Sequence, residues 1–519
     1  MCGLSAKPIL DKSHESKIQY RGPDSTYVVN EDSYCFTFHR LAIMDTSSLG
    51  DQPFVNEQWV VMCNGEIYNY TQIKQNNTYP YKSNSDCEVL LPLLNNYSLH
   101  ELCNILDGEF AFVGYNRQNK TIIAARDPMG IRPLFYGYSE NNQICFASEM
   151  KELLICCKQV FPFPPGFYFD GKQFFPYLQL YAINGSKHNN LAEVLPTIKN
   201  LLIKATKKRL HADVPVAFLL SGGLDSSLVC SIAAKHLNKQ IETFAIGLDV
   251  NPIDLKYAKQ VAQYLNSKHH EVIITNADVL DALKQVIWLT ETWDITTIRA
   301  SIPMYLLCKY IRQNSTAKVI LTGEISDELF GYKYTDFAPN AQEFQVESQK
   351  RIKELYMYDV LRADRCISSN GLEARVPFSD KEFIEYVMNI APELKMNKYN
   401  MGKYLLRKAF DNNEYLPQEI LWRDKAAFSD AVGHGMVDCL IAAADKMYSD
   451  DQYQQKIKAY PQNTPPSKEA LMYKEIFIQL FGNQEHVISS YWLPNQSWPN
   501  CQIRDPSARH LPNYGASGN

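Results

Sequence analysis

A short stretch of small and hydroxyl-bearing residues, 221–227, combines residue types that can bind phosphate. Its sequence is Ser-Gly-Gly-Leu-Asp-Ser-Ser, and it follows an apolar run at 216–220 that predicts a strand buried on both faces. Apolar residues then recur at helical spacing over 228–237, so the stretch joins a strand to a helix N-terminus. Gly222 and Gly223 allow close backbone approach, while the hydroxyls and the helix N-terminus attract anionic oxygens. The stretch therefore predicts a phosphate-binding loop.

Asp225, within this loop, indicates the form of the ligand. A carboxylate repels a phosphate unless a cation lies between them, so we expect a magnesium-bound nucleotide. The Gly-x-x-x-x-Gly-Lys-Ser/Thr pattern of the P-loop is absent from the sequence, which disfavours kinase-like γ-phosphate chemistry. The loop resembles the pyrophosphate loop of the ATP pyrophosphatase superfamily. Members of that superfamily activate a carboxylate or carbonyl as an adenylate and release pyrophosphate.

A second group of carboxylates follows another predicted buried strand. Glu324, Asp327 and Glu328 lie within five residues of one another. Such crowding is costly unless cations neutralise it or one group is protonated for acid–base work. Strands alternate with helices in this half of the chain, which predicts a parallel sheet with ligands beyond the carboxyl ends of its strands. Upstream, Arg299 lies among hydroxyl residues and suits a small carboxylate substrate, although a simple helix start would also explain the segment.

The N-terminal half carries a different chemistry. Removal of Met1 would make Cys2 the first residue, and its α-amino group, of a type whose pKa in peptides is about 7.7–8.0, could then take the thiol proton. Asn64 and Gly65 follow a predicted strand and could supply two neutral donors to an oxyanion. Surface or structural roles are the alternatives, a chance second residue for Cys2 and a hairpin turn for Asn64-Gly65.

Two charged residues complete this half. Arg40 ends a predicted strand and can pair with a substrate α-carboxylate, while Asp86 can accept a substrate ammonium. Together they would fit a zwitterionic amino acid. A surface ion pair for Arg40 and a helix cap for Asp86 are the alternatives.

Five motifs of this half resemble the glutaminase domain of class II glutamine amidotransferases. They are Met-Cys-Gly at 1–3, Arg-Gly-Pro-Asp at 21–24, His-Arg-Leu-Ala-Ile at 39–43, Asn-Gly-Glu-Ile-Tyr-Asn at 64–69 and Ser-Asp-Cys-Glu-Val at 85–89. The resemblance implies an N-terminal-nucleophile hydrolase-type αββα sandwich, with Cys2 as the nucleophile and Asn64 and Gly65 as the oxyanion hole. The glutamine-binding residues that it implies are Arg40, Leu41, Ala42, Ile43, Met44, Asn64, Gly65, Glu66 and Asp86.

Four segments of the second half, 318–331, 371–378, 422–430 and 505–509, resemble the synthetase domain of glutamine-hydrolysing asparagine synthetases, and the similarity runs nearly end to end. It implies that Asp225 and Asp327 bind magnesium. Glu324 would serve β-aspartyl-adenylate formation or ammonia attack, and Lys425 would steady the α-phosphate. Thr297 and Arg299 would face aspartate. The ATP-binding residues would be Leu220, Ser221, Gly222, Gly223, Asp225, Ser226, Ser227, Ile246, Thr322 and Gly323.

The chain departs from this family at Ile325, Tyr332 and Ala431, where glycine is usual. A left-handed backbone at any of these positions would strain the residue by about 1–3 kcal/mol. Only eighteen residues separate Cys2 from Arg21, fewer than the family usually has, so a helix there is expected to be shortened or lost.

Length and composition set the outer limits. The 519 residues predict a glutaminase domain at 2–181, a polar linker at 182–190 and an α/β parallel-sheet synthetase domain at 191–519. A net charge of −5 disfavours a nucleic-acid surface, and no apolar run approaches the ~18 residues of a membrane span. Thirteen cysteines without Cys-x-x-Cys spacing and the absence of a secretory signal predict reduced thiols in the cytoplasm. A homodimer is compatible with the resemblance.

These observations predict a two-site ligase. Glutamine is hydrolysed at Cys2, and the ammonia converts ATP-activated aspartate into asparagine, with release of AMP and pyrophosphate. One alternative is a glutaminase whose synthetase domain is impaired by Ile325. Another is a related amidotransferase that acts on a different carboxylate, although its β-lactam synthetase-like members often lack the terminal cysteine. A non-catalytic scaffold is the third.

Overall fold

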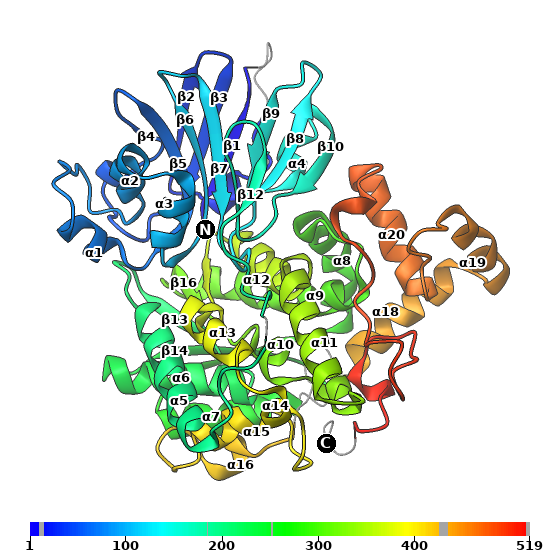
Figure 1. Cartoon of the computed structure of the whole chain (residues 1–519). Helices are drawn as coiled ribbons and strands as arrows, with labels where there is room; N and C mark the ends of the chain where they lie inside the picture. The colour runs from blue at the N-terminus through cyan, green and yellow to red at the C-terminus, as the bar shows by residue number, and fades with distance from the viewer. Residues whose placement is uncertain (10–14, 184, 251–252, 425–433, 515–519) are drawn as a thin grey trace.

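Two stacked antiparallel sheets form the N-terminal part of the chain (Figure 1). The computed structural model describes residues 1–9, 15–183, 185–250, 253–424 and 434–514. The first sheet has the order β10-β8-β9-β1-β3-β2, and the second has the order β12-β11-β7-β6-β5-β4. The strands of the first are β1 (Gly3–Pro8), β2 (Ser25–Glu31), β3 (Tyr34–Arg40), β8 (Phe135–Ser139), β9 (Ile144–Ala147) and β10 (Cys157–Pro162). Those of the second are β4 (Phe54–Val55), β5 (Trp59–Ile67), β6 (Gly108–Asn116), β7 (Thr121–Arg126), β11 (Phe167–Phe169) and β12 (Phe174–Pro176).

Alternating apolar residues explain why the sheets stack. Phe36 and Phe38 of β3 face Val60 and Met62 of β5 in one buried core, so every second residue of these strands points between the sheets. The outer face of the second sheet is covered by α1 (Tyr70–Gln75), α2 (Leu90–Asn96) and α3 (Leu99–Ile105). The outer face of the first packs on the short α4 (Met150–Leu153) and on helices from later in the chain. The predicted sandwich is confirmed.

The second part contains a parallel sheet with the order β15-β14-β13-β16-β17. Its strands are β13 (Val216–Leu219), β14 (Glu242–Leu248), β15 (Lys268–Ile274), β16 (Val319–Leu321) and β17 (Glu373–Arg375). Ala217 and Ile320 point into the core with α8 and α9, whereas Phe218 and Leu321 point into the core with α5 and α6. Both faces are buried, which is why these strands read as continuous apolar runs. The predicted α/β fold is confirmed.

Helices cover both faces of this sheet (Figure 1). One side carries α5 (Leu191–Lys208), α6 (Leu224–Leu237), α7 (Ile253–Leu265), α13 (Lys381–Met388) and α15 (Tyr404–Ala409). The other carries α8 (Asn276–Thr290), α9 (Ile295–Asn314), α12 (Asp359–Ser368), α18 (His434–Met447) and α20 (Lys468–Phe481). Shorter or peripheral helices are α10 (Ser326–Phe330), α11 (Ala341–Glu354), α14 (Pro392–Lys395), α16 (Gln418–Leu421) and α19 (Asp450–Lys456). Since β14 and β16 flank β13, the chain reverses direction across the sheet at β13, where such sheets bind ligands.

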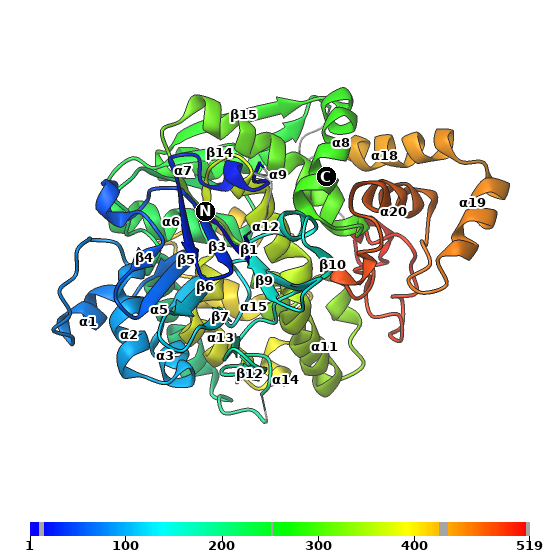
Figure 2. The same cartoon turned by 90° about the horizontal axis from the view of Figure 1, so that it is seen from above.

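The sandwich and the second part of the chain lie directly against each other in both views (Figures 1 and 2). Buried ion pairs join them. Arg21 is fully buried, with Nη1 2.6 Å from Glu149 Oε1 and two hydrogen bonds of 2.9 and 3.0 Å to the Asp364 carboxylate of α12. Its Nε also donates to the Cys2 carbonyl at 2.9 Å. Arg21 therefore connects the N-terminus to α12.

We expect Arg21→Met to destabilise the protein by about 3–5 kcal/mol, because it leaves Asp364 as an uncompensated buried charge. Urea unfolding followed by circular dichroism measures this loss. Lys120→Met, which removes an exposed pair with Asp32, serves as the control and should cost no more than about 1 kcal/mol. Equal losses in the two variants would show that the Arg21 pairs do not hold the two parts together.

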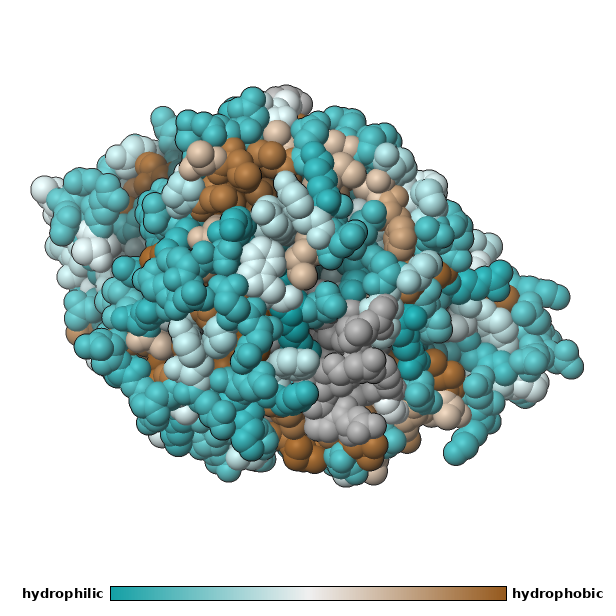
Figure 3. All heavy atoms as spheres, turned by 90° about the horizontal axis from the view of Figure 1, so that it is seen from below, coloured by the Kyte–Doolittle hydropathy of each residue, from teal (hydrophilic) through white to brown (hydrophobic). Residues whose placement is uncertain are grey.

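Within the described residues, no helix is long and apolar enough to cross a membrane. The face seen from below is largely hydrophilic, with a few separate hydrophobic areas (Figure 3).

Candidate active sites

The N-terminal thiol lies against the β5 strand. Asn64 Oδ1 accepts a hydrogen bond of 2.9 Å from the Cys2 backbone N–H, and the Leu41 N–H donates to Cys2 Sγ at 3.4 Å. Asn64 is fully buried, yet its Nδ2 has no hydrogen-bond partner among the described residues. The contact with Cys2 thus holds the Asn64 side-chain amide in place and leaves its Nδ2 group available as a donor. An oxyanion hole requires such a donor.

The thiol is poorly ionised in this setting. Burial raises the pKa of Cys2 to about 11, although the nearby N-terminal ammonium and the Leu41 backbone oppose the shift. Met1 is itself buried, and its ammonium donates to the Leu372 carbonyl at 3.2 Å. Burial lowers the pKa of that amine to about 6. Cys2 therefore needs a base close by to become a nucleophile.

Gly65 and its neighbours form the end of β5. A Cβ on Gly65 would lie 2.2 Å from the Glu109 carbonyl oxygen, so only glycine lets β5 and β6 approach this closely. The Glu66 carboxylate lies 2.9 Å from Arg375 Nη2, and Asp86 accepts from the Ile67 N–H at 2.7 Å. Burial raises the pKa of Asp86, and raises that of Glu66 well above its usual range. Both carboxylates thus lie at one end of the strand that carries Asn64.

Arg40 is held by its own neighbours. Its Nη1 lies 2.8 Å from Asp51 Oδ1, and its guanidinium also donates to the carbonyls of Met44, Asp45 and Ser47. Arg40 is thus in the ion pair that was the structural alternative, although the pair is largely buried. The predicted glutamine-binding turn that follows Arg40 is also buried and comprises Leu41, Ala42, Ile43 and Met44.

The predicted phosphate loop connects β13 to α6. Gly222 has φ 71°, and a Cβ there would lie 2.4 Å from the Ala258 backbone nitrogen, so glycine is required. Ser226 Oγ lies 3.0 Å from Ser221 Oγ and accepts from the Ser221 N–H at 3.2 Å. A Cβ on Gly323, just beyond β16, would lie 2.8 Å from the Ser226 backbone nitrogen. The two strand ends therefore bring their loops into direct contact.

The two predicted magnesium ligands both form ion pairs with one lysine. Lys403 Nζ lies 2.7 Å from Asp225 Oδ2 and 2.7 Å from Asp327 Oδ1. Ser326 Oγ donates to Asp225 Oδ1 at 2.7 Å and lies 3.1 Å from the same ammonium. The carboxylates thus converge on a single positive charge, although they come from α6 and α10. This pair fits a divalent cation, since carboxylate oxygens are its preferred ligands.

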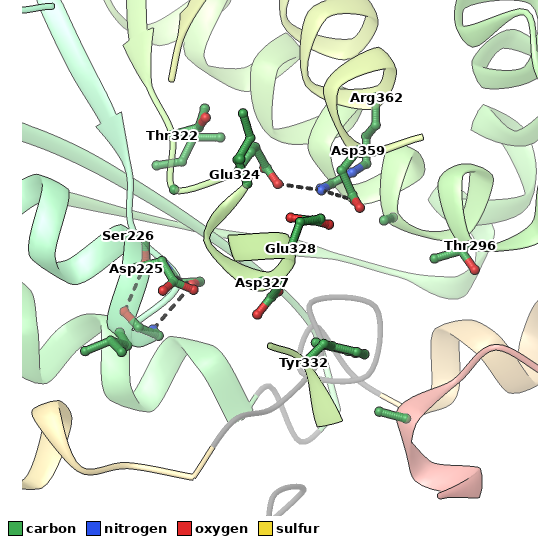
Figure 4. A pocket seen from close by; sticks show the side chains of 18 of the residues that line it. Asp225, Ser226, Thr296, Thr322, Glu324, Asp327, Glu328, Tyr332, Asp359 and Arg362 are labelled. Carbon is green, nitrogen blue, oxygen red and sulfur yellow. Dashed lines mark hydrogen bonds and ion pairs between the residues drawn. The ribbon is translucent and has the colours of Figure 1, made fainter. Parts of the chain in front are cut away.

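Glu324 and Glu328 complete the carboxylate group (Figure 4). Arg362 Nη2 lies 2.7 Å from Glu324 Oε2 and 2.7 Å from Asp359 Oδ1, so the arginine holds Glu324 from α12. Burial, followed by the charges of Asp359 and Asp327, raises the pKa of Glu328 well above its usual range. Arg362 and Lys403 therefore offset the crowding predicted from sequence, and burial favours the protonated form of Glu328.

The two residues predicted to face aspartate have other partners. Arg299 Nη2 lies 2.5 Å from Glu469 Oε2 and 2.9 Å from Asp505 Oδ2. Thr297 donates through its N–H and its hydroxyl to Asp294 Oδ2, both at 2.8 Å, which caps the start of α9. The helix start was the structural alternative for this segment.

One pocket contains most of the predicted synthetase residues. Its lining includes Leu220, Ser221, Gly223, Asp225, Ser226, Ile246, Arg299, Thr322, Gly323, Glu324 and Asp327. Gly222, Ser227 and Thr297 are not among the described residues that line it. Lys425 and Ala431 lie outside the described residues.

Ile325 has a left-handed backbone conformation, which is usually found at glycine. Its φ is 80° and its ψ is −21°, although its side chain is only 2% exposed. Tyr332, the second departure, has φ −117° and carries no such strain. The left-handed geometry therefore falls on a β-branched residue beside Glu324, at a cost of about 1–3 kcal/mol.

We expect Ile325→Gly to be more stable than Ile325→Ala by about 1 kcal/mol, because alanine keeps the left-handed penalty while both variants lose the buried side chain. In a right-handed helix the order is reversed. Urea unfolding of the two variants measures the difference. A more stable alanine variant would contradict the left-handed backbone.

Further residues of the pocket were given no role from the sequence, although Arg423 lies in the 422–430 segment that resembles the synthetase domain. Lys403, Asp359, Arg362 and Arg423 line it, and Arg423 Nη1 donates to the Gly222 carbonyl at 3.1 Å. Each belongs to a segment far from the phosphate loop along the chain, and only the fold brings them together.

Comparison with known proteins identifies both parts of the chain. Residues 1–163 match the family described as "Glutamine amidotransferase domain", and residues 197–347 and 336–504 match the family described as "Asparagine synthase". A "Probable asparagine synthetase [glutamine-hydrolyzing]" of Dictyostelium discoideum is 39% identical over an alignment of 557 positions that covers 98% of each chain.

Two further relatives agree. An "Asparagine synthetase [glutamine-hydrolyzing]" of Zea mays is 42% identical over an alignment of 504 positions that covers 92% of this chain and 84% of the relative. A "Probable asparagine synthetase [glutamine-hydrolyzing]" of Acanthamoeba polyphaga mimivirus is 41% identical over an alignment of 531 positions that covers 96% of this chain and 95% of the relative. With both modules in this order and similarity along nearly its whole length, the chain belongs to the glutamine-hydrolysing asparagine synthetase family.

Proposed function

We propose that the chain makes L-asparagine from L-aspartate, with ATP and with ammonia released from L-glutamine. The observation that carries the synthetase half of this proposal is the pocket in which Asp225 and Asp327 converge on one cation beside the phosphate loop. The family relationship supports the same reaction. The glutaminase domain is residues 2–181, the linker 182–190, and the synthetase domain 191–519.

In the glutaminase step, Cys2 acts after removal of Met1. Its α-amino group takes the thiol proton, and the thiolate attacks the side-chain amide of glutamine. Asn64 Nδ2 and the Gly65 N–H donate to the developing oxyanion, and the proton passes to the departing nitrogen, which leaves as ammonia. Water then hydrolyses the glutamyl thioester. The unused Asn64 Nδ2 supports this role.

Substrate charges are matched by residues around the thiol. Arg40 would bind the glutamine α-carboxylate while it shares its guanidinium with Asp51, and Glu66 and Asp86 would accept the ammonium. Ammonia at neutral pH is mostly ammonium, which has no lone pair to attack with. We therefore place the transfer between the sites in an enclosed passage.

In the synthetase step, the loop at 221–227 binds the ATP phosphates, and the aspartate side chain attacks the α-phosphate to give β-aspartyl-AMP and pyrophosphate. Ammonia then displaces AMP. Asp225 and Asp327 would hold Mg²⁺, which neutralises phosphate charge when bound. Glu324, oriented by Arg362, would take a proton from the attacking ammonia.

The remaining assignments concern aspartate and the α-phosphate. Arg299 lines the pocket while Glu469 and Asp505 share its guanidinium, so we assign it, with Thr297, to the wall of the aspartate site. Lys425 would steady the α-phosphate. The cysteines are all free thiols, which supports a reducing compartment such as the cytoplasm.

The test is amino-acid analysis of a reaction that contains glutamine, aspartate, ATP and magnesium, run in parallel with Asp225→Ala. Asparagine in the wild-type reaction alone supports the ligase. Ammonia without asparagine in the wild-type reaction supports the second candidate, a glutaminase with an impaired synthetase, which the strained Ile325 favours. A wild-type reaction that yields neither asparagine nor ammonia would refute both the ligase and the glutaminase.

A further inference from the structure

Three thiols outside both proposed sites converge at one edge of the sandwich. Cys145 lies in β9, Cys157 begins β10, and Cys156 immediately precedes it. The three sulfur atoms lie within 4.8 Å of one another, and the Sγ atoms of Cys156 and Cys157 are 3.7 Å apart. Cys145 and Cys157 are 0% and 4% exposed, whereas Cys156 is half-buried. No other group of three metal-ligating side chains in the described part of the chain is as close.

The convergence depends on Gly137 of β8. Both β9 and β10 pair with β8, so they lie about 9–10 Å apart, with β8 between them. Cys145 pairs directly with Gly137, and a Cβ on Gly137 would lie 3.0 Å from Cys157 Sγ and 2.9 Å from its Cβ. The missing side chain leaves space over the middle strand. The register of β10 also shifts between Cys157 and Val160, and such a bulge re-aims side chains.

The 3.7 Å separation of the Cys156 and Cys157 sulfurs is close to the value for shared coordination to one metal. A cation about 2.3 Å from each sulfur places the sulfurs about 3.8–4.0 Å apart in tetrahedral or trigonal geometry. A disulfide needs about 2.05 Å and would use only two of the three sulfurs.

We propose that Cys145, Cys156 and Cys157 form a three-thiolate site for one soft metal cation, of the Cu⁺ or Zn²⁺ class. Thiolates select these cations over hard ones such as Mg²⁺. Each thiol releases its proton to solvent when the metal binds. A water molecule could complete a tetrahedral Zn²⁺ shell on the side of the half-buried Cys156, whereas Cu⁺ would need the three sulfurs alone.

The three cysteines lie where the sandwich contacts the C-terminal part of the chain. β10 also contacts η8 (Glu485–Val487) and the residue before it, since the Val160 N–H donates to Gln484 Oε1 at 3.2 Å. The Phe161 and His486 rings lie 4.8 Å apart between centroids. A bound metal would therefore stiffen the edge of the sandwich where it meets the C-terminal part of the chain.

The experiment titrates reduced, metal-free, full-length protein with Cu⁺ and, separately, with Zn²⁺ against a competing chromogenic chelator under anaerobic conditions. We expect one equivalent per chain for the preferred ion, and an affinity at least about tenfold weaker for Cys156→Ser. Gly137→Ala should also weaken binding, because its methyl group would crowd Cys157 Sγ. Cys35→Ser, a half-buried thiol elsewhere in the same sheet, is the matched control and should bind as the wild type does.

X-ray absorption of the loaded protein should show sulfur neighbours at about 2.3 Å. Circular dichroism establishes that each variant is folded, and the half-buried Cys156 is the variant chosen because its loss disturbs the core least. Equal affinity in wild type and Cys156→Ser, or a metal shell of nitrogen and oxygen alone, would overturn the proposal. A disulfide in air-exposed protein, together with no binding by the reduced protein, would do the same.

Discussion

We expect Cys2→Ala to lose glutamine-dependent asparagine synthesis by about 10³-fold or more, while synthesis from ammonium salts continues at the wild-type rate. The thiol is the proposed nucleophile, and alanine supplies no group that can form the thioester. Alanine keeps the backbone N–H that donates to Asn64 Oδ1, so the strand and the oxyanion hole stay in place. The synthetase residues come from other segments and are untouched. Asparagine measured with each nitrogen source separates the two effects.

Two controls sharpen this result. Alanine is small enough for Met1 to be removed, so intact mass should show both wild type and variant without Met1. Cys439→Ala, a half-buried thiol in α18, should leave both activities unchanged. Release of ammonia from glutamine by Cys2→Ala would rule out the thiol as nucleophile, and an active chain that retains Met1 would rule out the α-amino group as base.

The sequence predicted several strands of both folds because their apolar pattern follows directly from burial. In β13, adjacent residues face two different cores, so the strand reads as an unbroken apolar run. β17 could not be predicted in this way. Its three residues are Glu373, Ala374 and Arg375, and two of them are buried charges that pair with each other at 2.9 Å. Only their tertiary partners make those charges tolerable in a sheet.

For the site, local motifs predicted one residue of each ion pair but not its partner. Asp225 and Asp327 are conspicuous in sequence because they follow shortly after buried strands, yet Lys403, which bridges them, is 178 residues from Asp225. Similarly, the Arg21 motif gave no sign of Asp364, 343 residues away. A charged residue on a helix has the same local pattern whether its partner is solvent or a distant carboxylate. Long-range pairs of this kind are fixed by packing, not by spacing.

Arg299 shows that residue type alone does not identify the partners of a charge. Its charge suits a carboxylate substrate, but the structure supplies two carboxylates from the chain itself, Glu469 and Asp505. Burial alone would make an unpaired guanidinium costly, so a buried arginine has protein partners before any substrate arrives. The role of Arg299 towards aspartate therefore remains a proposal.

Asp327→Asn should reduce asparagine synthesis by about 10²-fold or more and leave glutamine hydrolysis unchanged. The substitution removes one of the two carboxylates proposed to hold Mg²⁺, while Lys403 keeps its 2.7 Å pair with Asp225. The lysine charge thus stays compensated and the fold should survive. Retention of one carboxylate also predicts weakened, not abolished, magnesium binding. Aspartate- and ATP-dependent pyrophosphate release, measured over a magnesium titration, should therefore show a higher half-saturating concentration.

A matched carboxylate tests whether this effect belongs to the site. Asp411 pairs with Lys408 on the surface of the same half of the chain, so Asp411→Asn should leave both the rate and the magnesium dependence unchanged. Equilibrium binding of Mn²⁺ as a paramagnetic probe gives a readout without turnover and should weaken only in Asp327→Asn. If both variants bound the probe like the wild type and differed only in rate, Asp327 would act on the reaction without holding the cation. The convergence of Asp225 and Asp327 would then serve to position Lys403, whose ammonium would itself be the charge that faces the phosphates.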